Sequence, residues 1–367
     1  MNTFPKSLPL KIEGVEALRA IAATMIVIFH TVALSKIALP ESLLFIRTYF
    51  GMGVPLFYVL SGFVLAYGYG DTLTNRTAIL RFYLKRFFRI APLFYIMLAV
   101  WLIAGWWKWG KTTLPIWDIL LNITFTFGLV PGKHESIVWA GWSIGVEMIF
   151  YLIFPLILIL ITGIRSGIFI LLIMSFISAS AYSALDQAGF GSYSYMNLLT
   201  QLPFFLAGTL AYRIGKSMHF QQNLLTGVAL FLIATTTTVL IVALSGKTPF
   251  TSSFLVALHR DIWGVVFMSF VLSVSCWPNR LIVNRILIGL GSISFSLYLL
   301  HPLVIVILIF LGIYNRITAA LGNGYINFFV CLLITAGILI PMSLLSFRFI
   351  EKPGIYLGKQ LAHRIGE

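Results

Sequence analysis

Two ionisable side chains lie eleven positions apart inside the first apolar segment of the chain. Arg19 and His30 bracket the stretch "RAIAATMIVIFH", in which the residues between them are apolar or small. On an α-helix eleven residues turn through ~1100°, so both side chains leave the same face, ~16 Å apart along the axis. An ionisable group deep in such a run is costly and is functional by default. The alternatives are an Arg19 that only reaches back to an interface and a His30 that is a satisfied core histidine.

A carboxylate lies in a second apolar segment, "VWAGWSIGVEMIFYLIFP", where Ser143, Glu147 and Tyr151 follow one another at i, i+4 and i+8 and share a helix face. At such depth Glu147 must be paired or protonated. Pairing with His30 is attractive because a carboxylate can fix the tautomer of an imidazole. The alternative is a structural Glu147 held by neighbouring hydroxyl groups.

A second histidine lies in the stretch "SISFSLYLLHPL". Ser294, Tyr298 and His301 fall within two helical turns on one face. His301 is therefore a candidate for substrate contacts, unless it only bonds the carbonyl groups that Pro302 leaves free.

A basic segment, "RFYLKRFFRIAP", repeats cations at Arg81, Lys85 and Arg89, with Arg86 beside them. We interpret it as a cytoplasmic loop. Guanidinium groups bind phosphates in a bidentate manner, so the cluster suits a ligand with several phosphates. No glycine-rich phosphate-binding fingerprint accompanies it, and an anchor for lipid headgroups is the alternative.

The composition identifies the class of protein that must position these groups. Hydrophobic residues make up 59% of the chain and charged residues only 10%, whereas a soluble domain carries about 25% charged residues. The chain is therefore expected to be a polytopic membrane protein. The net charge of +14 does not indicate nucleic-acid binding, because the basic residues are spread over short loops as orientation in a bilayer requires. The two cysteines provide neither a disulfide framework nor a metal-binding spacing, and we expect no metal.

The expected fold is an all-α integral membrane protein, one domain over residues 1–367 with about ten transmembrane helices. We place the spans at 15–35, 48–70, 91–107, 138–163, 166–185, 197–214, 224–245, 261–277, 286–311 and 325–347. The stretch 117–130 is too short to span, and we expect no fused extra-cytoplasmic domain. Most Lys and Arg residues fall on one side if both termini are cytoplasmic. This orientation puts the basic segment inside and His30, Glu147 and His301 in the outer half of the membrane.

Six motifs resemble the integral-membrane acyltransferase-3 family of bacterial O-acyltransferases. They are "RAIAATMIVIFH", "LFYVLSGFVL", "KRFFRIAPLFY", "WSIGVEMIFYLIFP", "ISFSLYLLHPL" and "FIEKP", in this order over essentially the whole chain. Each is weak alone, and together they are specific. The resemblance implies ten core spans, an acyl-coenzyme A donor and a glycan or similar hydroxyl acceptor. One departure is Met148 after Glu147, where the family often has a second glutamate, which puts a two-carboxylate role in doubt.

The resemblance also implies roles for individual residues. It makes His30 the essential histidine with Arg19 as its partner, and it puts the donor phosphates on Arg86 and Arg89, with Lys85 beside them. Acyl transfer needs a base for the hydroxyl group and stabilisation of an oxyanion. His30, with an ordinary pKa near 6.5, is the expected base or, as a second choice, a transient acyl carrier, and Glu147 would orient it. The remaining candidates for substrate contacts or oxyanion stabilisation are Ser143, Tyr151, Tyr298 and His301.

The expected function is therefore O-acylation in the bacterial cytoplasmic (inner) membrane. Acetyl-coenzyme A would be the donor substrate, no cofactor would be permanently bound, and the acceptor would be a surface glycan or lipid-linked glycan such as O-antigen, exopolysaccharide or lipo-oligosaccharide. The partners would be the donor, the acceptor and membrane lipids. One alternative keeps the enzyme but makes the acceptor a small molecule, such as an antibiotic or a lipid. The other is a transporter or flippase, since kinked spans and buried ionisable residues also mark transport paths.

Overall fold

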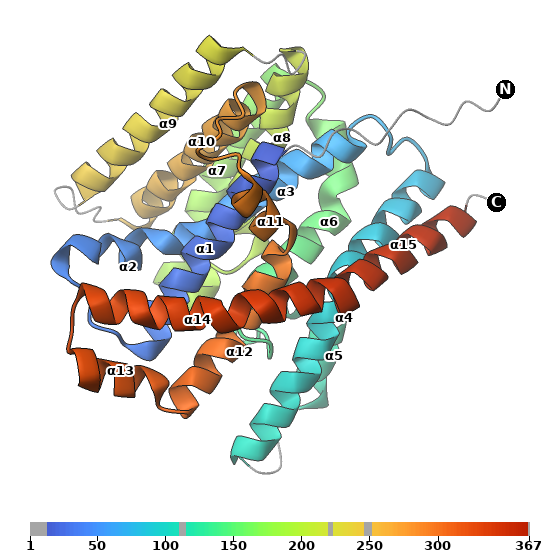
Figure 1. Cartoon of the computed structure of the whole chain (residues 1–367). Coiled ribbons are helices and arrows are strands. Elements are labelled where there is room, and N and C mark those ends of the chain that lie inside the picture. The colour runs from blue at the N-terminus through green and yellow to red at the C-terminus, as the bar shows by residue number, and fades with distance from the viewer. Residues whose placement is uncertain (1–12, 110–114, 219–222, 246–251, 366–367) are drawn as a thin grey trace.

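The computed structural model describes residues 13–109, 115–218, 223–245 and 252–365, and within these ranges the regular elements are helices without any strand. Short 3-10 turns (η1–η4) and one π-helical turn (η5) join the α-helices (Figure 1). In chain order the elements are α1 (Glu13–Ser35), η1 (Glu41–Leu43), α2 (Phe45–Tyr49), η2 (Phe50–Met52), α3 (Gly53–Tyr69), α4 (Arg76–Trp109), α5 (Ile116–Ile123), η3 (Phe127–Leu129), α6 (Trp142–Leu160), α7 (Ile164–Gln187), η4 (Gly191–Ser194), α8 (Leu198–Ser217), α9 (Leu224–Ser245), α10 (Ser253–Cys276), α11 (Arg285–Ser292), α12 (Ser294–Phe310), α13 (Ile313–Leu321), α14 (Tyr325–Ser346), η5 (Phe347–Glu351) and α15 (Lys352–Arg364).

The described helices have the lengths and composition of a membrane protein. Eight helical stretches among the described residues are long and apolar enough to cross a bilayer, and α11 with α12 make a ninth if the bent pair is one span. The 20-residue α8 coincides with the remaining predicted span but carries Gln201, Arg213 and Lys216. The all-helical, multi-span class is thus confirmed, whereas the count of ten spans and the cytoplasmic position of the termini stay predictions.

The basic segment is helical, contrary to the loop expected from the sequence. α4 starts at Arg76 and continues for 34 residues, so the cations lie on the same helix as the span predicted at 91–107. The segment is stabilised because α15 packs against it closely: a Cβ at Gly354 would lie 2.8 Å from the Phe88 carbonyl oxygen, and one at Gly358 2.7 Å from the Phe88 Cβ. Tertiary packing therefore extends the helix where composition alone indicated a loop.

α3 packs closely against α8, most of whose residues are buried. A Cβ added at Gly62 would meet the Phe205 carbonyl oxygen at 2.1 Å, and one at Gly208 would meet the Val59 carbonyl oxygen at 1.9 Å. Glycine is thus required at both positions for the two backbones to touch. The aromatic rings of Tyr58 and Phe205 stack beside this contact, 4.4 Å apart. The close contact fixes α3, which forms one wall of the cavity described below.

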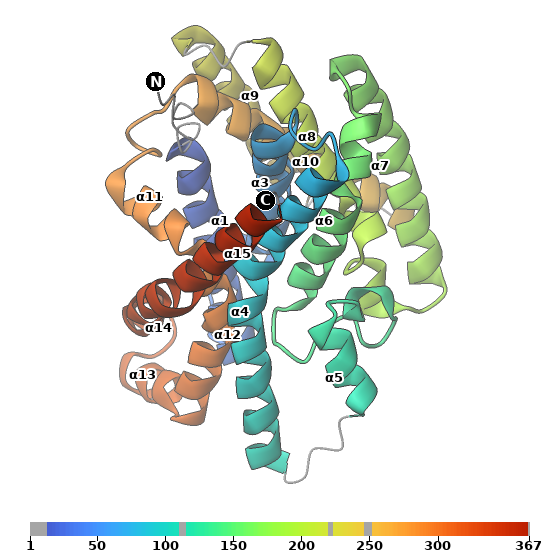
Figure 2. The same ribbon diagram turned by 90° about the vertical axis from the view of Figure 1, so that its right-hand side faces the viewer.

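α1 packs against a broken helix. The axes of α11 and α12 bend by 71° around Ile293. Gly291, just before the break, lies so close to α1 that a Cβ there would be 1.9 Å from the Glu16 carbonyl oxygen. The break therefore allows α12 to start beside the N-terminal half of α1 and to run along it (Figures 1 and 2).

The stretch 117–130 forms α5 and η3, and the eight-residue α5 is too short to span a membrane. Asn122 organises the segment that follows, because its Oδ1 accepts hydrogen bonds from Ser136 Oγ (2.6 Å) and from the backbone N–H of Ile137 (3.1 Å). Ala140, near the end of this segment, has a left-handed backbone with φ of 61°. This ordered segment leads directly into α6 and the cavity.

Candidate active site

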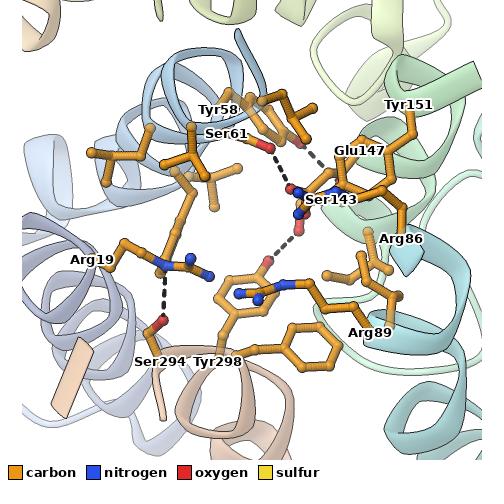
Figure 3. A pocket seen from close by; sticks show the side chains of 18 residues that line it. Arg19, Tyr58, Ser61, Arg86, Arg89, Ser143, Glu147, Tyr151, Ser294 and Tyr298 are labelled. Atoms are coloured by element: carbon orange, nitrogen blue, oxygen red, sulfur yellow. Dashed lines mark hydrogen bonds between the residues drawn. The ribbon is translucent and has the colours of Figure 1, made fainter. Parts of the chain in front are cut away.

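A cavity lies between α1, α3, α4, α6 and α12. Its empty volume is about 700 Å³, including the part that is open to solvent. Its lining combines apolar side chains with a few converging polar groups. The polar members are Arg19, Tyr58, Ser61, Arg86, Arg89, Ser143, Glu147, Tyr151, Ser294 and Tyr298 (Figure 3).

Three arginines reach the cavity from opposite sides. Figure 3 shows Arg19 of α1 on one side and Arg86 and Arg89 of α4 on the other, with Tyr298 between them. Arg19 Nε donates to Ser294 Oγ (3.3 Å), at the first residue of α12. The Arg86 guanidinium lies over the Tyr69 ring, 5.1 Å from its centroid, and its buried Nε has no hydrogen-bond partner among the described residues. Three guanidinium groups against one lining carboxylate make the cavity suitable for an anion.

Glu147 belongs to this arginine cavity and not to the histidine. Its Oε1 accepts hydrogen bonds from Ser61 Oγ of α3 and from Tyr151 OH, each at 2.6 Å. The sequence suggested a pairing with His30, but the carboxylate is held by hydroxyl groups, as in the structural alternative. The reason is the packing of the helices: α6 presents Glu147 to α3 and α4, whereas His30 faces α12.

Ser143 and Tyr298 form a hydrogen-bonded pair between α6 and α12. Tyr298 OH donates to the Ala140 carbonyl oxygen (2.9 Å), so it must accept the hydrogen of Ser143 Oγ, 2.7 Å away. The hydroxyl hydrogens of both residues are therefore already engaged. Neither group can stabilise an oxyanion unless one of these bonds breaks, and their main effect here is to join α6 to α12.

His30 and His301 form the second polar centre. His301, fully buried, places Nε2 3.0 Å from His30 Nδ1, and the ring centroids are 4.8 Å apart. His301 Nδ1 lies 2.5 Å from the Tyr298 carbonyl oxygen, and His30 Nδ1 lies 3.1 Å from the Ile26 carbonyl oxygen.

The carbonyl groups assign the tautomers of the two imidazoles. A carbonyl oxygen only accepts, so both Nδ1 atoms carry hydrogen in the neutral rings. The bare Nε2 of His301 can then accept from His30 Nδ1–H, which is shared with Ile26. This arrangement leaves the lone pair of His30 on Nε2, which is the atom able to take a proton from a substrate.

The two polar centres lie along one contact between helices. Arg19 touches Ser294 at one end of the α1–α12 contact, and His30 touches His301 at the other. Seven residues separate Ser294 from His301, so they too share a helix face. Neither histidine lines the arginine cavity, but the Tyr298 ring, which does, lies 5.7 Å from the His301 ring. Tyr298 therefore connects the cavity to the imidazole pair.

Lys85 is not among the residues that line the cavity, although it precedes Arg86. Lys85 lies about 100° from Arg86 around α4 but only about 40° from Arg89, so helical periodicity alone does not account for its place outside the lining. Sequence reasoning also missed a residue. Glu351, which is 3% exposed in the π-helical turn η5, accepts a hydrogen bond from Ser296 Oγ and interacts electrostatically with Arg89 and Arg19. Its position in the motif "FIEKP" was the signal that the sequence offered.

The helices and the cavity define a multi-span membrane protein with a cationic cavity beside a buried imidazole pair. The family model described as an acyltransferase domain, of the acyltransferase-3 type, matches residues 12–345. The chain therefore belongs to this acyltransferase family.

A curated relative carries the same activity in its name. The chain is 35% identical over 126 residues to Acyltransferase MdmB of Streptomyces mycarofaciens, a match that covers 31% of this chain and 30% of that protein. The match thus spans less than a third of the relative's length. No solved structure matches the chain.

Proposed function

We propose that the protein transfers an acyl group, in the first place acetyl, from acyl-coenzyme A to a hydroxyl group of a surface glycan at the bacterial inner membrane. The single observation that carries the proposal is the convergence of Arg19, Arg86 and Arg89 on one cavity, next to the helix contact that holds His30. Membership of the family supports acyl transfer as the reaction. The three arginines support acyl-coenzyme A as the donor, and His30 is the proposed base.

The donor fits the charge and the length of the site. Coenzyme A carries a pyrophosphate, and guanidinium groups bind such oxygens with strong, paired hydrogen bonds. The buried Arg86 Nε has no hydrogen-bond partner among the described residues, so one donor of this guanidinium is left unsatisfied by the protein. From the Arg19 end to His30 the helix rises ~16 Å, a distance that suits an extended pantetheine arm leading to the thioester.

The chemistry at the far end needs one base. His30 Nε2 takes the proton of the acceptor hydroxyl group while the oxygen of that group bonds to the carbonyl carbon of the thioester. The carbon–sulfur bond of the resulting tetrahedral intermediate then breaks, and the leaving thiolate receives the proton from His30. His301 acts as a positioning residue that holds the His30 ring through Nδ1. In the second choice His30 Nε2 bonds to the acyl carbon as the thiolate leaves, and the proton of the acceptor hydroxyl then passes to that thiolate as the acyl group moves to the acceptor oxygen.

The acceptor is proposed from the family resemblance. A glycan is proposed because the family resemblance favours it, and the alternative is a small molecule such as an antibiotic or a lipid. The name of the Streptomyces relative specifies an acyltransferase and no acceptor. No observation in the described structure favours transport without a covalent step.

Donor binding tests the proposal, with a control on the same helix turn. Arg86→Ala and Arg89→Ala should each weaken coenzyme A binding about 10- to 100-fold, because a hydrogen bond to a charged group contributes about 1.5–3 kcal/mol. Lys85→Ala removes a neighbouring cation that does not line the cavity, and it should bind coenzyme A within about twofold of wild type. Equal affinities in all three variants would contradict the donor assignment. Isothermal titration of the detergent-purified proteins measures the affinities.

A further inference from the structure

A second cationic pocket lies away from the candidate active site, between the turn that joins α6 to α7 and the last turn of α8. Arg165 at the start of α7 and Arg213 and Lys216 near the end of α8 line it. The pocket is open, with about 1010 Å³ of empty space including solvent. In Figure 2 this end of α7 and α8 lies at the top, near the turn that joins α3 to α4. It shares no residue with the arginine cavity.

The pocket retains positive charge after its internal contacts are counted. Lys216 Nζ bonds both carboxylate oxygens of Asp71, at 2.7 and 2.5 Å. This hydrogen bond lowers the pKa of Asp71, which therefore stays ionised and neutralises one cation. Arg213 Nε donates to the Ile161 carbonyl oxygen (2.9 Å), which fixes the guanidinium but leaves its charge. Arg165 is exposed and has no ion-pair partner among the described residues.

The backbone adds donors to the same pocket. α7 begins after Gly163, which has no side chain to cap the first-turn N–H groups, and nothing within 4 Å occupies the space where its Cβ would be. Ser166 Oγ accepts from the N–H of Gly163 (3.0 Å), but no side chain caps the first-turn N–H groups of this 24-residue helix, so they favour an anion in addition to the three cations.

The surroundings of the pocket indicate the kind of anion. Exposed apolar side chains flank it on both helices: Ile159 (71% exposed) and Leu160 on α6, and Ile168 and Phe169 (64% exposed) on α7. These are the faces that an all-helical membrane protein presents to acyl chains. A ligand with a phosphate head and an apolar tail satisfies both the pocket and its flanks.

We propose that this pocket, formed by Arg165, Arg213, Lys216 and the first turn of α7, binds the headgroup phosphate of an anionic phospholipid. The Lys and Arg distribution predicts that this end of the bundle is cytoplasmic, where basic pockets between spans meet anionic headgroups. The 3′-phosphate of coenzyme A has the same chemistry. The lipid is the occupant the structure favours, since the exposed apolar flanks adjoin the pocket and the pocket shares no residue with the arginine cavity.

The test compares two pairs of charge removals in the detergent-purified full chain. Arg165→Gln with Lys216→Gln removes two pocket cations, and Arg280→Gln with Arg364→Gln removes two exposed cations elsewhere on the predicted cytoplasmic side. Native mass spectrometry measures binding of dioctanoyl phosphatidylglycerol. The pocket pair should bind it about 25-fold more weakly, since each cation near an anionic lipid contributes about fivefold. The control pair should stay within about threefold of wild type.

Three results would overturn the proposal. The pocket pair could bind the lipid as wild type does, or the control pair could lose as much affinity, which would mean diffuse attraction only. The third is unchanged lipid affinity in the pocket pair together with a lost preference for coenzyme A over 3′-dephospho-coenzyme A. That result would assign the pocket to the donor. Lipid binding is measured without acyl transfer, so it is independent of the proposed function.

Discussion

Replacing His301 by Asn should slow acyl transfer without weakening donor binding. Asn keeps a donor for the Tyr298 carbonyl oxygen but does not reach His30, whereas Gln can place an acceptor where His301 Nε2 now lies, 3.0 Å from His30 Nδ1. In the Asn variant the Nδ1–H of His30 keeps only the hydrogen bond to the Ile26 carbonyl oxygen at 3.1 Å. One of the two hydrogen bonds that orient the His30 ring is therefore lost. A misplacement of about 1 Å at a reacting group slows a reaction by about 100-fold. We expect kcat to fall roughly 10- to 100-fold, which is about 1.4–2.7 kcal/mol.

The assay is release of coenzyme A thiol from acetyl-coenzyme A in native membranes that supply the acceptor, with matched protein levels. His301→Gln should retain most of the wild-type kcat, because one neutral hydrogen bond of about 1 kcal/mol is replaced rather than lost. Coenzyme A affinity should be unchanged in both variants, since His301 does not line the arginine cavity. Equal losses in the Asn and Gln variants, or a loss confined to donor affinity, would refute the assignment of tautomers.

Three further predictions follow from packing, hydrogen bonding and sidedness. Gly62→Ala should destabilise the protein by about 3 kcal/mol or more and so lower its thermal unfolding temperature, whereas a Cβ at Gly68 on the same helix meets nothing within 4 Å, and Gly68→Ala should leave that temperature unchanged. Tyr151→Phe removes one of two hydroxyl donors to the Glu147 carboxylate and should destabilise the protein by about 1.5–3 kcal/mol in the same measurement. In sealed, oriented vesicles, transfer should occur with acyl-coenzyme A on the cytoplasmic side and acceptor on the outer side, and transfer only when both are cytoplasmic would show that the predicted depth of His30 is wrong.

Helical periodicity predicted what lies on one helix. Arg19 and His30 do share a face of α1, since both contact α12. Their partners Ser294 and His301 share a face of α12. Arg86 and Arg89, about 60° apart around α4, both line the cavity. These features depend only on local geometry, which the sequence encodes directly.

Contacts between helices were not predictable in the same way. His30 pairs with His301 and not with Glu147, because which helix faces α1 depends on the break at Ile293 and on the close approach of Gly291. The helical start of α4 depends on α15, far away in the sequence. The depth of a residue in the membrane, counted along its span, does not indicate which residues of other helices it contacts.

The most direct test of the central claim separates donor binding from transfer in His30→Ala. The substitution removes the proposed base but no residue that lines the arginine cavity. Coenzyme A affinity of the folded variant should therefore match wild type, while acyl transfer to the acceptor should fall at least 100-fold, the lower end of the contribution of a general base. Transfer near the wild-type rate by a folded His30→Ala protein would contradict the account.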